Sequence, residues 1–377
     1  MGSIRAAGRG SLTALLMFLH GLCVCNVAHA YWISSPAEQS FAQETNPPVH
    51  AHRHIADVAG PAIRPVGSAR QGDDWYAEKE HTNLPESAIE QFGVYEVAPG
   101  VYVHPGRHVH IDHPHRDDIA NAGFIVGERC VAVIDPGGSV LQGSRLREAI
   151  RARTDLPICL IFNTHVHFDH IIGTAAFVSD IAAGAEVVGH AGLAEAIAAN
   201  QAFFVEAFAA EMQTEEGRRV TLPRPVHAVE TQADFDLGAR PLTATAYPEA
   251  HSRTDLTVLD RKTQTLFTGD LVFRTRIPAL DGSVLGWRDA LAKLAGLDVA
   301  VWVPGHGAPT DDIEDALGPI SAYLASLERE TRAAIQSGQS LAEAKDSVAG
   351  ETAQKWELHE YNHARNVSRA FRELEWE

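Results

Sequence analysis

Apolar residues recur with a strand-like period in some segments of this chain and with a helical period in others. Short alternating or continuous apolar runs, bounded by Gly, Pro, Asp or Asn, predict β-strands, and longer runs with helical spacing predict helices. The predicted strands lie in residues 93–106, 123–139, 157–165, 185–190, 231–275 and 299–307. The predicted helices cover residues 143–153, 170–180 and 191–212, begin again near Trp287, and fill most of residues 308–377.

The order of these elements predicts an α/β fold that contains two sheets. Two strand-rich blocks, residues 93–139 and 231–275, are each followed by helices and further strands. This order favours two sheets packed face to face with the helices outside. Residues 31–92 lack such periodicity and are rich in Pro, Ala, Ser and His, which predicts an extended, partly disordered leader. The folded domain is then expected to span residues 93–377.

The first thirty residues carry the three parts of a secretory signal peptide. Arg5 and Arg9 precede an apolar run at residues 12–25 that is too short to span a bilayer, and small residues precede Tyr31. We expect cleavage after Ala30, export to the periplasm, and no membrane insertion after cleavage. A retained membrane anchor is the alternative.

The charge and the cysteines narrow the expected partners and compartment. The net charge is −18, and loss of residues 1–30 would make it two units more negative, because two arginines and no acidic residue leave. Such a chain repels nucleic acid and anionic lipid, so a small-molecule substrate is the expected partner. Cys130 and Cys159 remain after cleavage. They can form a disulfide in an oxidising compartment or stay as two buried thiols.

Four potential metal ligands follow the buried strand predicted at residues 157–165. They are His165, His167, Asp169 and His170. Two histidines two positions apart on an extended backbone face the same way, so the first two can chelate one ion. The adjacent Asp and His lie on the turn and can address a second ion. A hydrogen-bonded polar turn is the alternative interpretation.

Three more potential ligands occupy similar positions further along the chain. His251, Asp270 and His306 each follow an apolar run, and glycine precedes the last two. Imidazole and carboxylate without thiolate, in a site that leaves room for water, suit zinc. The sequence therefore predicts a metal centre, with iron or manganese as other ions that these ligands accept.

The motifs T-H-x-H-x-D-H, a later lone His, T-G-D and P-G-H-G occur in this order between residues 164 and 307. In this combination the chain resembles the metallo-β-lactamase superfamily over roughly residues 93–310. The resemblance implies a four-layer αββα sandwich with the active site at one edge of the sheets. It also implies two zinc ions, one bound by His165, His167 and His251, the other by Asp169, His170 and His306, with Asp270 bridging them.

The residue at position 270 separates branches of this superfamily. The lactamases proper generally hold Cys or Ser there, whereas hydrolases of the glyoxalase II kind hold a bridging Asp, as this chain does. The signal peptide and residues 121–139, 278–287 and 364–377 are also similar to periplasmic zinc metallohydrolases encoded beside quinoprotein dehydrogenase and sulfur-oxidation systems. That likeness implies service to a periplasmic dehydrogenase system.

The resemblance implies an exported binuclear zinc hydrolase. In such an enzyme a metal-bound hydroxide attacks the carbonyl of an ester, thioester or related substrate. Water, Asp169 or Asp270 then protonates the leaving group. The sequence contains no nucleophile-elbow motif that would offer a serine instead.

Two further aspartates are candidates for orienting the ligands. Asp135 ends a strand and resembles an aspartate that could hold the loop of residues 165–167 by hydrogen bonds. A turn residue before Pro136 is the alternative. Asp255 could orient His251 in the same way, or lie in a surface turn.

Arg274 and Arg276 lie shortly after the predicted bridging aspartate and can face a substrate carboxylate or phosphate. Solvated arginines are the alternative. Residues 104–115 contain several histidines, which can buffer zinc or touch substrate, although an exposed polar loop explains them more simply.

Three other functions remain open from the sequence. A true β-lactamase is disfavoured by Asp270. A mononuclear iron dioxygenase acting on persulfides typically lacks part of the second metal set, which is complete here. A non-catalytic periplasmic metal-binding accessory protein is favoured by the His-rich residues 104–115, but storage does not need a bridging carboxylate.

Overall fold

The computed structural model describes residues 92–377, so the predicted signal peptide and residues 31–91 of the predicted leader lie outside the described residues. The first sheet has seven strands that follow one another in chain order. Strands β1 to β4 pair antiparallel and β4 to β7 pair parallel. The seven are β1 (Tyr95–Ala98), β2 (Val101–His104), β3 (Ala122–Val126), β4 (Val131–Ile134), β5 (Ile158–Phe162), β6 (Glu186–His190) and β7 (His227–Val229).

The second sheet has five strands in the order β12-β11-β10-β9-β8. They are β8 (Gln232–Asp236), β9 (Pro241–Ala246), β10 (Leu256–Asp260), β11 (Thr265–Phe273) and β12 (Val301–His306). Only β11 and β12 are parallel, and helix α7 (Val284–Leu294) makes the crossover that a parallel pair requires. The ends of β11 and β12 therefore lie at the same edge of the sheet.

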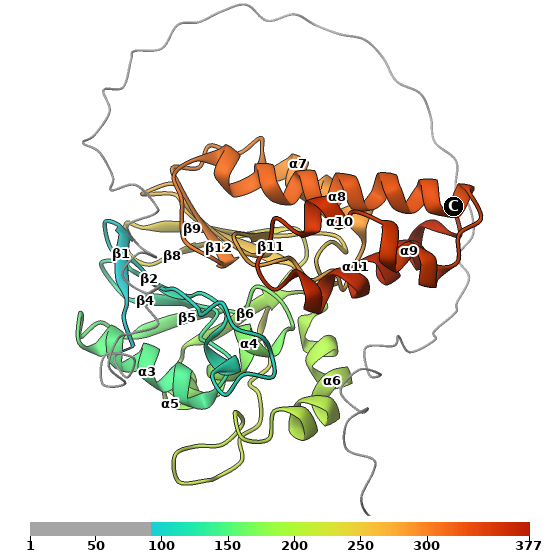
Figure 1. The fold of residues 1–377 in the computed structure, drawn as a ribbon. Helices are drawn as coiled ribbons and strands as arrows, with labels where there is room; N and C mark the ends of the chain where they lie inside the picture. The colour runs from blue at the N-terminus through green and yellow to red at the C-terminus, as the bar shows by residue number, and fades with distance from the viewer. Residues whose placement is uncertain (1–91) are drawn as a thin grey trace, which may run out of the picture. The chain divides into compact units, whose positions relative to one another are not determined.

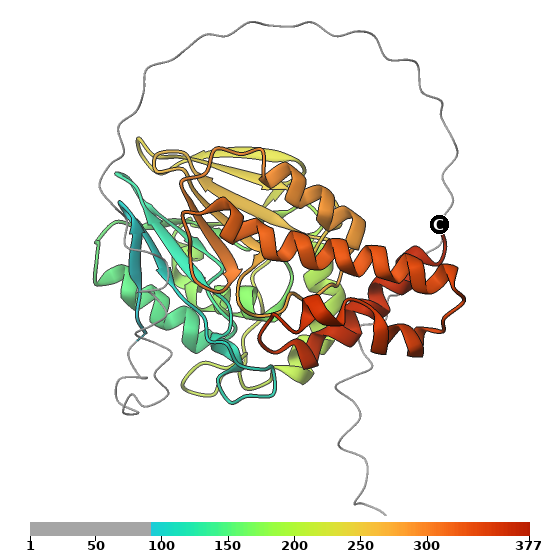
Figure 2. The same ribbon diagram turned by 45° about the horizontal axis from the view of Figure 1, so that its top comes forward.

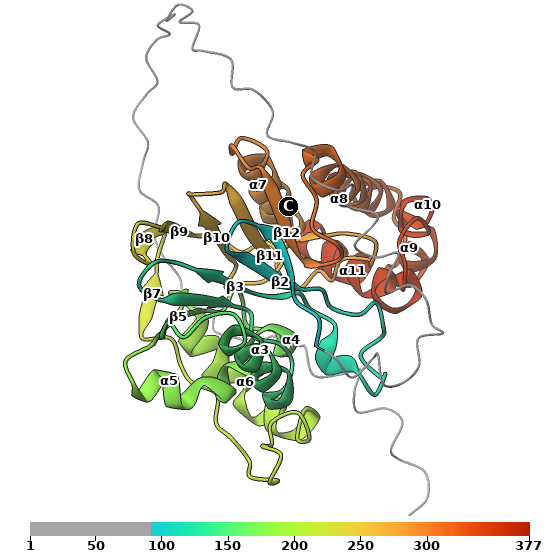
Figure 3. The ribbon, with the colours of Figure 1, turned by 90° about the vertical axis from the view of Figure 1, so that its left-hand side faces the viewer.

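Helices cover the outer face of each sheet, which confirms the predicted four-layer αββα sandwich. Helices α3 (Val140–Arg151) and α5 (Val178–Ala182) pack on the first sheet, and α7 and α8 (Ile313–Gln336) pack on the second. Figure 1 shows these layers from the side, and Figure 3 shows the two sheets between their helices from another direction.

Strand β4 shows why its sequence is apolar throughout. Ala132 and Ile134 point into the core between the two sheets, whereas Val131 and Val133 point into the core under α3. Alternate side chains of a strand face opposite sides, so a strand covered on both faces needs apolar residues at every position.

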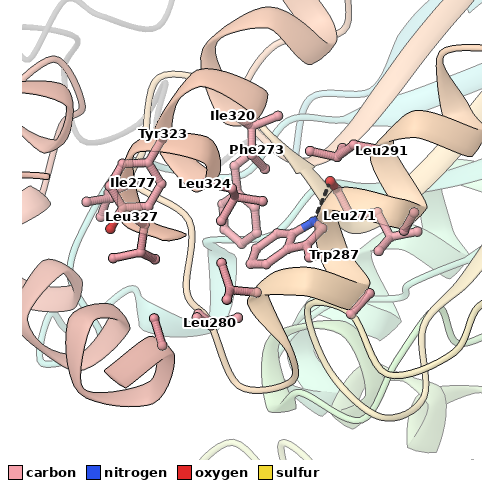
Figure 4. Packing of buried hydrophobic residues seen from close by; sticks show 14 of the residues in the cluster. Leu271, Phe273, Ile277, Leu280, Trp287, Leu291, Ile320, Tyr323, Leu324 and Leu327 are labelled. Atoms are coloured by element: carbon pink, nitrogen blue, oxygen red, sulfur yellow. Dashed lines mark hydrogen bonds between the residues drawn. The ribbon is translucent and has the colours of Figure 1, made fainter. Parts of the chain in front are cut away.

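A third core lies between the second sheet and the helices above it. Trp287 of α7 is fully buried there and donates a hydrogen bond from Nε1 to the Leu271 carbonyl at 3.0 Å (Figure 4). Ile320 and Leu324 of α8 complete this cluster. Helices α10 (Gly350–Ala353) and α11 (His359–Leu374) pack against α8, and α9 (Leu341–Ser347) packs against α11, in the red C-terminal part of Figure 2. Within residues 92–377, no helix combines the length and apolar character needed to cross a membrane.

The predicted helix over residues 170–180 is instead divided into short pieces. They are α4 (Phe168–Ile171), the 3-10 helix η2 (Ile172–Phe177) and α5. A Cβ at Gly173 would lie 2.1 Å from the Pro136 carbonyl oxygen, so this segment runs in direct contact with the turn after β4. The predicted helix over residues 191–212 ends early, as α6 (Leu193–Ala207), and another 3-10 helix, η1 (Arg116–Asp118), precedes β3.

Cys130 and Cys159 form a disulfide, so the alternative of two separate thiols is wrong. Cys130 immediately precedes β4 and Cys159 lies in β5, and these two strands are parallel neighbours. The sheet itself brings the two Cα atoms to 5.8 Å, within the range that a disulfide spans.

Candidate metal centre

The seven predicted ligands meet at one edge of the two sheets. His165 and His167 follow β5, Asp270 lies within β11, and His306 ends β12. His251 lies in the loop between β9 and β10. All of these side chains are buried, together with Asp169 and His170 at the start of α4.

Three histidines and one aspartate form the first group of ligand atoms. His167 Nδ1 lies 3.0 Å from His165 Nε2 and 3.0 Å from His251 Nε2. Asp270 Oδ2 lies 3.6 Å from His165 Nε2 and 3.4 Å from His251 Nε2. The four atoms face a common point and could hold one ion.

The second group contains Asp169, His170 and His306. Asp169 Oδ2 lies 3.7 Å from His170 Nε2 and 3.4 Å from His306 Nε2. Asp270 also faces this group, with Oδ1 3.1 Å from His170 Nε2 and Oδ2 3.3 Å from His306 Nε2. Asp270 therefore lies between the two groups.

The donor atoms fit metal ions in both spacing and chemistry. Zinc–ligand bonds of about 2.0–2.1 Å in a tetrahedral site would place neighbouring ligand atoms about 3.4 Å apart. The separations here run from 3.0 to 3.7 Å. His170 Nε2 and Asp270 Oδ1 are buried, and although they lie 3.1 Å apart they make no hydrogen bond within residues 92–377. A buried polar atom without a hydrogen bond is unfavourable, and a bound ion would satisfy both.

The outer nitrogens of the histidines have acceptors that turn the inner nitrogens toward the centre. His251 Nδ1 lies 2.7 Å from the Ala279 carbonyl oxygen, and His306 Nδ1 lies 2.7 Å from that of Ile119. Since a carbonyl can only accept, these rings carry their proton on Nδ1 and leave an Nε2 lone pair for a ligand bond.

The Asp135 side chain makes hydrogen bonds to Thr164, the residue before the ligand His165. Its Oδ1 accepts from the Thr164 amide at 2.8 Å, and its Oδ2 accepts from the Thr164 hydroxyl at 2.7 Å. The same Oδ2 lies 2.8 Å from His170 Nδ1. Its backbone has a φ of 46°, a left-handed conformation that is unfavourable for a residue with a side chain. One carboxylate thus supports both the loop and the ring of a ligand.

The prediction that Asp255 orients His251 requires correction. Asp255 accepts hydrogen bonds from the Ser252 amide at 2.9 Å and the Ser252 hydroxyl at 2.6 Å. It therefore shapes the turn after His251, whose ring is oriented by the Ala279 carbonyl. Burial raises the pKa of the Asp255 carboxyl group to about 7.

The two predicted substrate arginines differ in their surroundings. Arg274 pairs with Asp315 on α8 and donates to the Ala308 carbonyl, so its guanidinium group is bound by the protein itself. Its role is to hold the segment after β12. Arg276 is buried, and its positive charge acts on His108 in the His-rich loop.

The His-rich loop is only partly the exposed polar loop that the sequence favoured. Residues 111–115 are exposed, but His108 Nδ1 lies 3.0 Å from Glu357 Oε2, and His110 stacks on Tyr361 with ring centroids 3.5 Å apart. Ile119, which supports His306, follows the same loop. The loop therefore connects the beginning of α11 with the edge of the candidate centre.

The electrostatics leave two histidines and the central aspartate ready to bind a cation and favour a proton on a third histidine. Burial lowers the pKa of His165, and it lowers the pKa of His251 to about 3, so both rings are neutral at pH 7. Burial opposes ionisation of Asp270, but neighbouring rings, chiefly His306 and His170, hold its pKa well below the usual value. Burial likewise opposes protonation of His170, but Asp270 and Asp135 raise its pKa well above the usual value. Metal binding would displace that proton.

Three residues around the centre escaped the sequence analysis. Asp281 Oδ2 lies 2.9 Å from His167 Nε2. The Trp287 ring meets the His251 ring edge-on at 5.1 Å between centroids, and Phe273 stacks on His306 at 4.9 Å. In the sequence, Trp287 marked only the start of a predicted helix, and Phe273 was only part of a predicted strand block. Asp281 lies in residues 278–287, which were noted for their likeness but given no role.

A family model described as the metallo-beta-lactamase superfamily matches residues 115–306, about half of the chain and most of the sandwich. The matched range contains every residue of the two candidate metal groups. The chain therefore belongs to the metallo-β-lactamase superfamily.

Solved structures share the same fold. A metallo-beta-lactamase from Pontibacter korlensis is 20% identical, with 62% of this chain and 99% of that chain covered and a TM-score of 0.51. The stereoselective inverting sec-alkylsulfatase Pisa1 from Pseudomonas sp. is also 20% identical, with a TM-score of 0.58. That match covers 76% of this chain and 50% of the sulfatase, so this chain spans about half of its length. A comparison with curated proteins finds no match. At these identities the structures establish the shared fold.

The close approach of β12 to β11 gives a test of the site geometry. A Cβ at Gly305 would lie 2.0 Å from Asp270 Oδ1, so we expect Gly305→Ala to displace this carboxylate. Elemental analysis of the purified variant should find at least a twofold loss of bound metal relative to the parent chain.

Gly350→Ala is the matched control, because a Cβ at Gly350 meets no atom within 4 Å. It should keep its full metal content. Unchanged metal content in Gly305→Ala would contradict the placement of Asp270.

Proposed function

We propose that this protein is a metal-dependent hydrolase with two metal ions, zinc in the first instance, held by the two groups described above. The position of Asp270 is the observation that carries the proposal. One of its oxygens lies 3.1 Å from His170 of the second group, and the other lies 3.4 Å from His251 of the first. A carboxylate between two ions holds them close enough to share one substrate.

The expected substrate is an ester, thioester or related carbonyl compound. When bound, two such ions supply an activated water and polarise a carbonyl oxygen. The chain contributes the fixed positions of the ligands and two carboxylates, Asp169 and Asp270, that can pass a proton to the leaving group. The Asp at position 270, where lactamases generally hold Cys or Ser, favours substrates whose leaving group departs easily.

A narrower placement belongs to the same proposal. We infer service to a periplasmic quinoprotein dehydrogenase or sulfur-oxidation system, from the likeness of residues 278–287 and 364–377 to metallohydrolases of such systems. The two segments are in contact, since Asn366 accepts from the Leu280 amide at 2.9 Å and donates to the Pro278 carbonyl at 2.7 Å. The two similar segments therefore form one contiguous part of the structure.

Export is also part of the proposal. The signal-peptide pattern of residues 1–30 supports it, and so does the Cys130–Cys159 disulfide, because such bonds persist mainly in oxidising compartments. Intact-mass measurement on protein from a periplasmic extract should find a chain that begins at Tyr31. A form beginning at Met1 and confined to the cytoplasm would rule out export.

Arg276 is proposed as a contact for an anionic group of the substrate. Burial lowers the pKa of His108, Glu357 opposes this, and the charges of Arg276 and His306 add to the lowering. The buried Arg276 also pairs through its backbone with Glu357, the residue that lies 3.0 Å from His108, which supports a position beside the loop. The planar guanidinium fork can donate two parallel hydrogen bonds to the oxygens of a carboxylate.

Arg276→Lys keeps the charge and loses the fork, so KM for a carboxylate-bearing substrate should rise about tenfold with a smaller change in kcat. Arg274→Lys is the matched control, because Arg274 pairs with Asp315 instead. Steady-state kinetics of the two variants would compare them. An equal effect of both substitutions on KM would contradict the assignment of Arg276 as a substrate contact.

The reaction class is tested by Asp270→Asn on a panel of substrates. We expect metal-dependent cleavage of a thioester or activated ester, and a loss of at least a hundredfold in kcat/KM, on the order of 3 kcal/mol of transition-state stabilisation. Asp255→Asn makes the same change in a buried carboxyl group that bonds only Ser252 in the described hydrogen-bond network, so it should keep most of the activity.

The panel should also contain a β-lactam, an alkyl sulfate and, with iron-loaded protein, a persulfide under oxygen. The alkyl sulfate is included because a structural neighbour is named as a sulfatase. Fast turnover of the lactam, or oxygen uptake on the persulfide, would contradict the proposed reaction and leave the fold unaffected.

A further inference from the structure

The loop between β11 and α7 carries polar partners for two histidines of the first metal group, a hydrogen-bond acceptor for one and an ion-pair partner for the other. The Ala279 carbonyl oxygen lies 2.7 Å from His251 Nδ1, and Asp281 Oδ2 lies 2.9 Å from His167 Nε2. Both rings turn their other nitrogen toward the same point. A movement of this loop would therefore displace two of the four donors in that group.

His167 differs from the other four histidines in the nitrogen that it turns inward. Its Nδ1 faces His165 and His251, whereas the other rings present Nε2. A lone pair on Nδ1 requires the proton to be on Nε2. Nε2 is the ring nitrogen farther from the residue's own backbone, so its acceptor has to come from another part of the chain. Asp281 Oδ2, an ion-pair partner 2.9 Å from Nε2, is the group in that position.

Asp281 is itself held by the C-terminal helix. Its Oδ1 pairs with the guanidinium of Arg365 in α11. The Asp281 side chain is only 12% exposed, so its charge depends on partners within the protein. The ion pair between Oδ1 and Arg365 leaves Oδ2 facing His167.

The same helix fixes the backbone of the loop. Asn366 bonds the Leu280 amide at 2.9 Å and the Pro278 carbonyl at 2.7 Å, and Arg369 Nε donates to the Gly282 carbonyl at 2.9 Å. The Leu280 side chain anchors the loop in the core beneath it (Figure 4). Helix α11 lies outside residues 115–306, the range that the family model matches.

We propose that Asp281 is a positioning residue for the metal group of His165, His167 and His251, and that Arg365 of α11 fixes its orientation. The C-terminal helix thereby controls one metal site without supplying a ligand to it. This inference rests on the proposed function, because it presumes that the two groups bind metal. The inference also implies that only one of the two sites depends on α11. The described partners of His170 and His306, in the second group, are Asp135 and the Ile119 carbonyl, and neither of these lies on α11.

The test is a zinc titration of the metal-depleted full chain against a chromophoric chelator, with the two binding steps resolved. Loss of an outer hydrogen-bond partner of a metal-bound histidine weakens binding by roughly ten- to a hundredfold. Asp281→Ala should therefore weaken one step by that factor and leave the other unchanged. Arg365→Met should weaken the same step. The double variant should be no weaker than Asp281→Ala, because both changes act through one contact.

Two further variants separate positioning from general damage to the fold. Arg372→Met makes the same chemical change on an exposed residue of the same helix and should leave both steps unchanged. Asp281→Asn keeps an acceptor oxygen for His167 and should recover most of the affinity, which also serves the test if Asp281→Ala does not fold. Cobalt(II) loaded into the first site should show altered visible absorption bands in Asp281→Ala and Arg365→Met but not in Arg372→Met.

The outcomes distinguish a failure of the positioning role of Asp281 from a failure of the proposed metal-dependent function. Equal zinc affinities in the parent, Asp281→Ala and Arg365→Met would overturn the positioning role and leave the metal centre intact. Equal weakening of both steps by Arg365→Met would also overturn it, because α11 would then act on the whole fold. A parent chain that binds no metal would overturn the proposed function itself.

Discussion

The buried carboxylate of Asp270 is the constraint on which the rest of the site depends. It faces His170 at 3.1 Å, His306 at 3.3 Å and His251 at 3.4 Å. Concentrating a carboxylate and several imidazole lone pairs away from water is unfavourable unless cations or protons lie between them. Metal ions can satisfy all of these atoms together, which explains why polar groups gather at an edge that is otherwise enclosed by apolar cores.

The fold supports this arrangement from several directions. The turn after β4 supplies Asp135, the loop before β3 supplies the Ile119 carbonyl, and the loop before α7 supplies Ala279 and Asp281. The strands must also approach closely, and Gly269 meets this need. It has a φ of 51°, and a Cβ there would lie 2.6 Å from the side chain of Thr164. The surrounding fold thus holds the ligands in position, as a precise ligand set requires.

The strands, helices and ligand positions that depend on local sequence patterns could be predicted from the sequence. Apolar runs preceded His165, Asp270 and His306 and so marked these ligands, although β11 continues past Asp270 to Phe273, and the order of strands and helices predicted the sandwich. The broken helix after His170 was missed because its cause, the packing of Gly173 on the turn at Pro136, joins separate segments.

The missed and corrected residues have the same explanation. Asp281 and Arg365 meet across a long stretch of chain, and no periodicity marks either of them. Arg274 looked like a substrate contact until α8 placed Asp315 against it. Asp255 lies close to His251 in sequence, but it bonds the intervening turn at Ser252. Partners of polar side chains depend on tertiary packing, which a single sequence does not display.

Anomalous diffraction at the zinc edge, from crystals of the zinc-loaded protein, can locate the ions. A centre with two zinc ions predicts two peaks per chain, each about 2.0–2.2 Å from its nitrogen and oxygen ligands. One should be surrounded by His165, His167 and His251, the other by Asp169, His170 and His306, with Asp270 between them. A single peak, or density for zinc elsewhere while both groups hold only water, would contradict it.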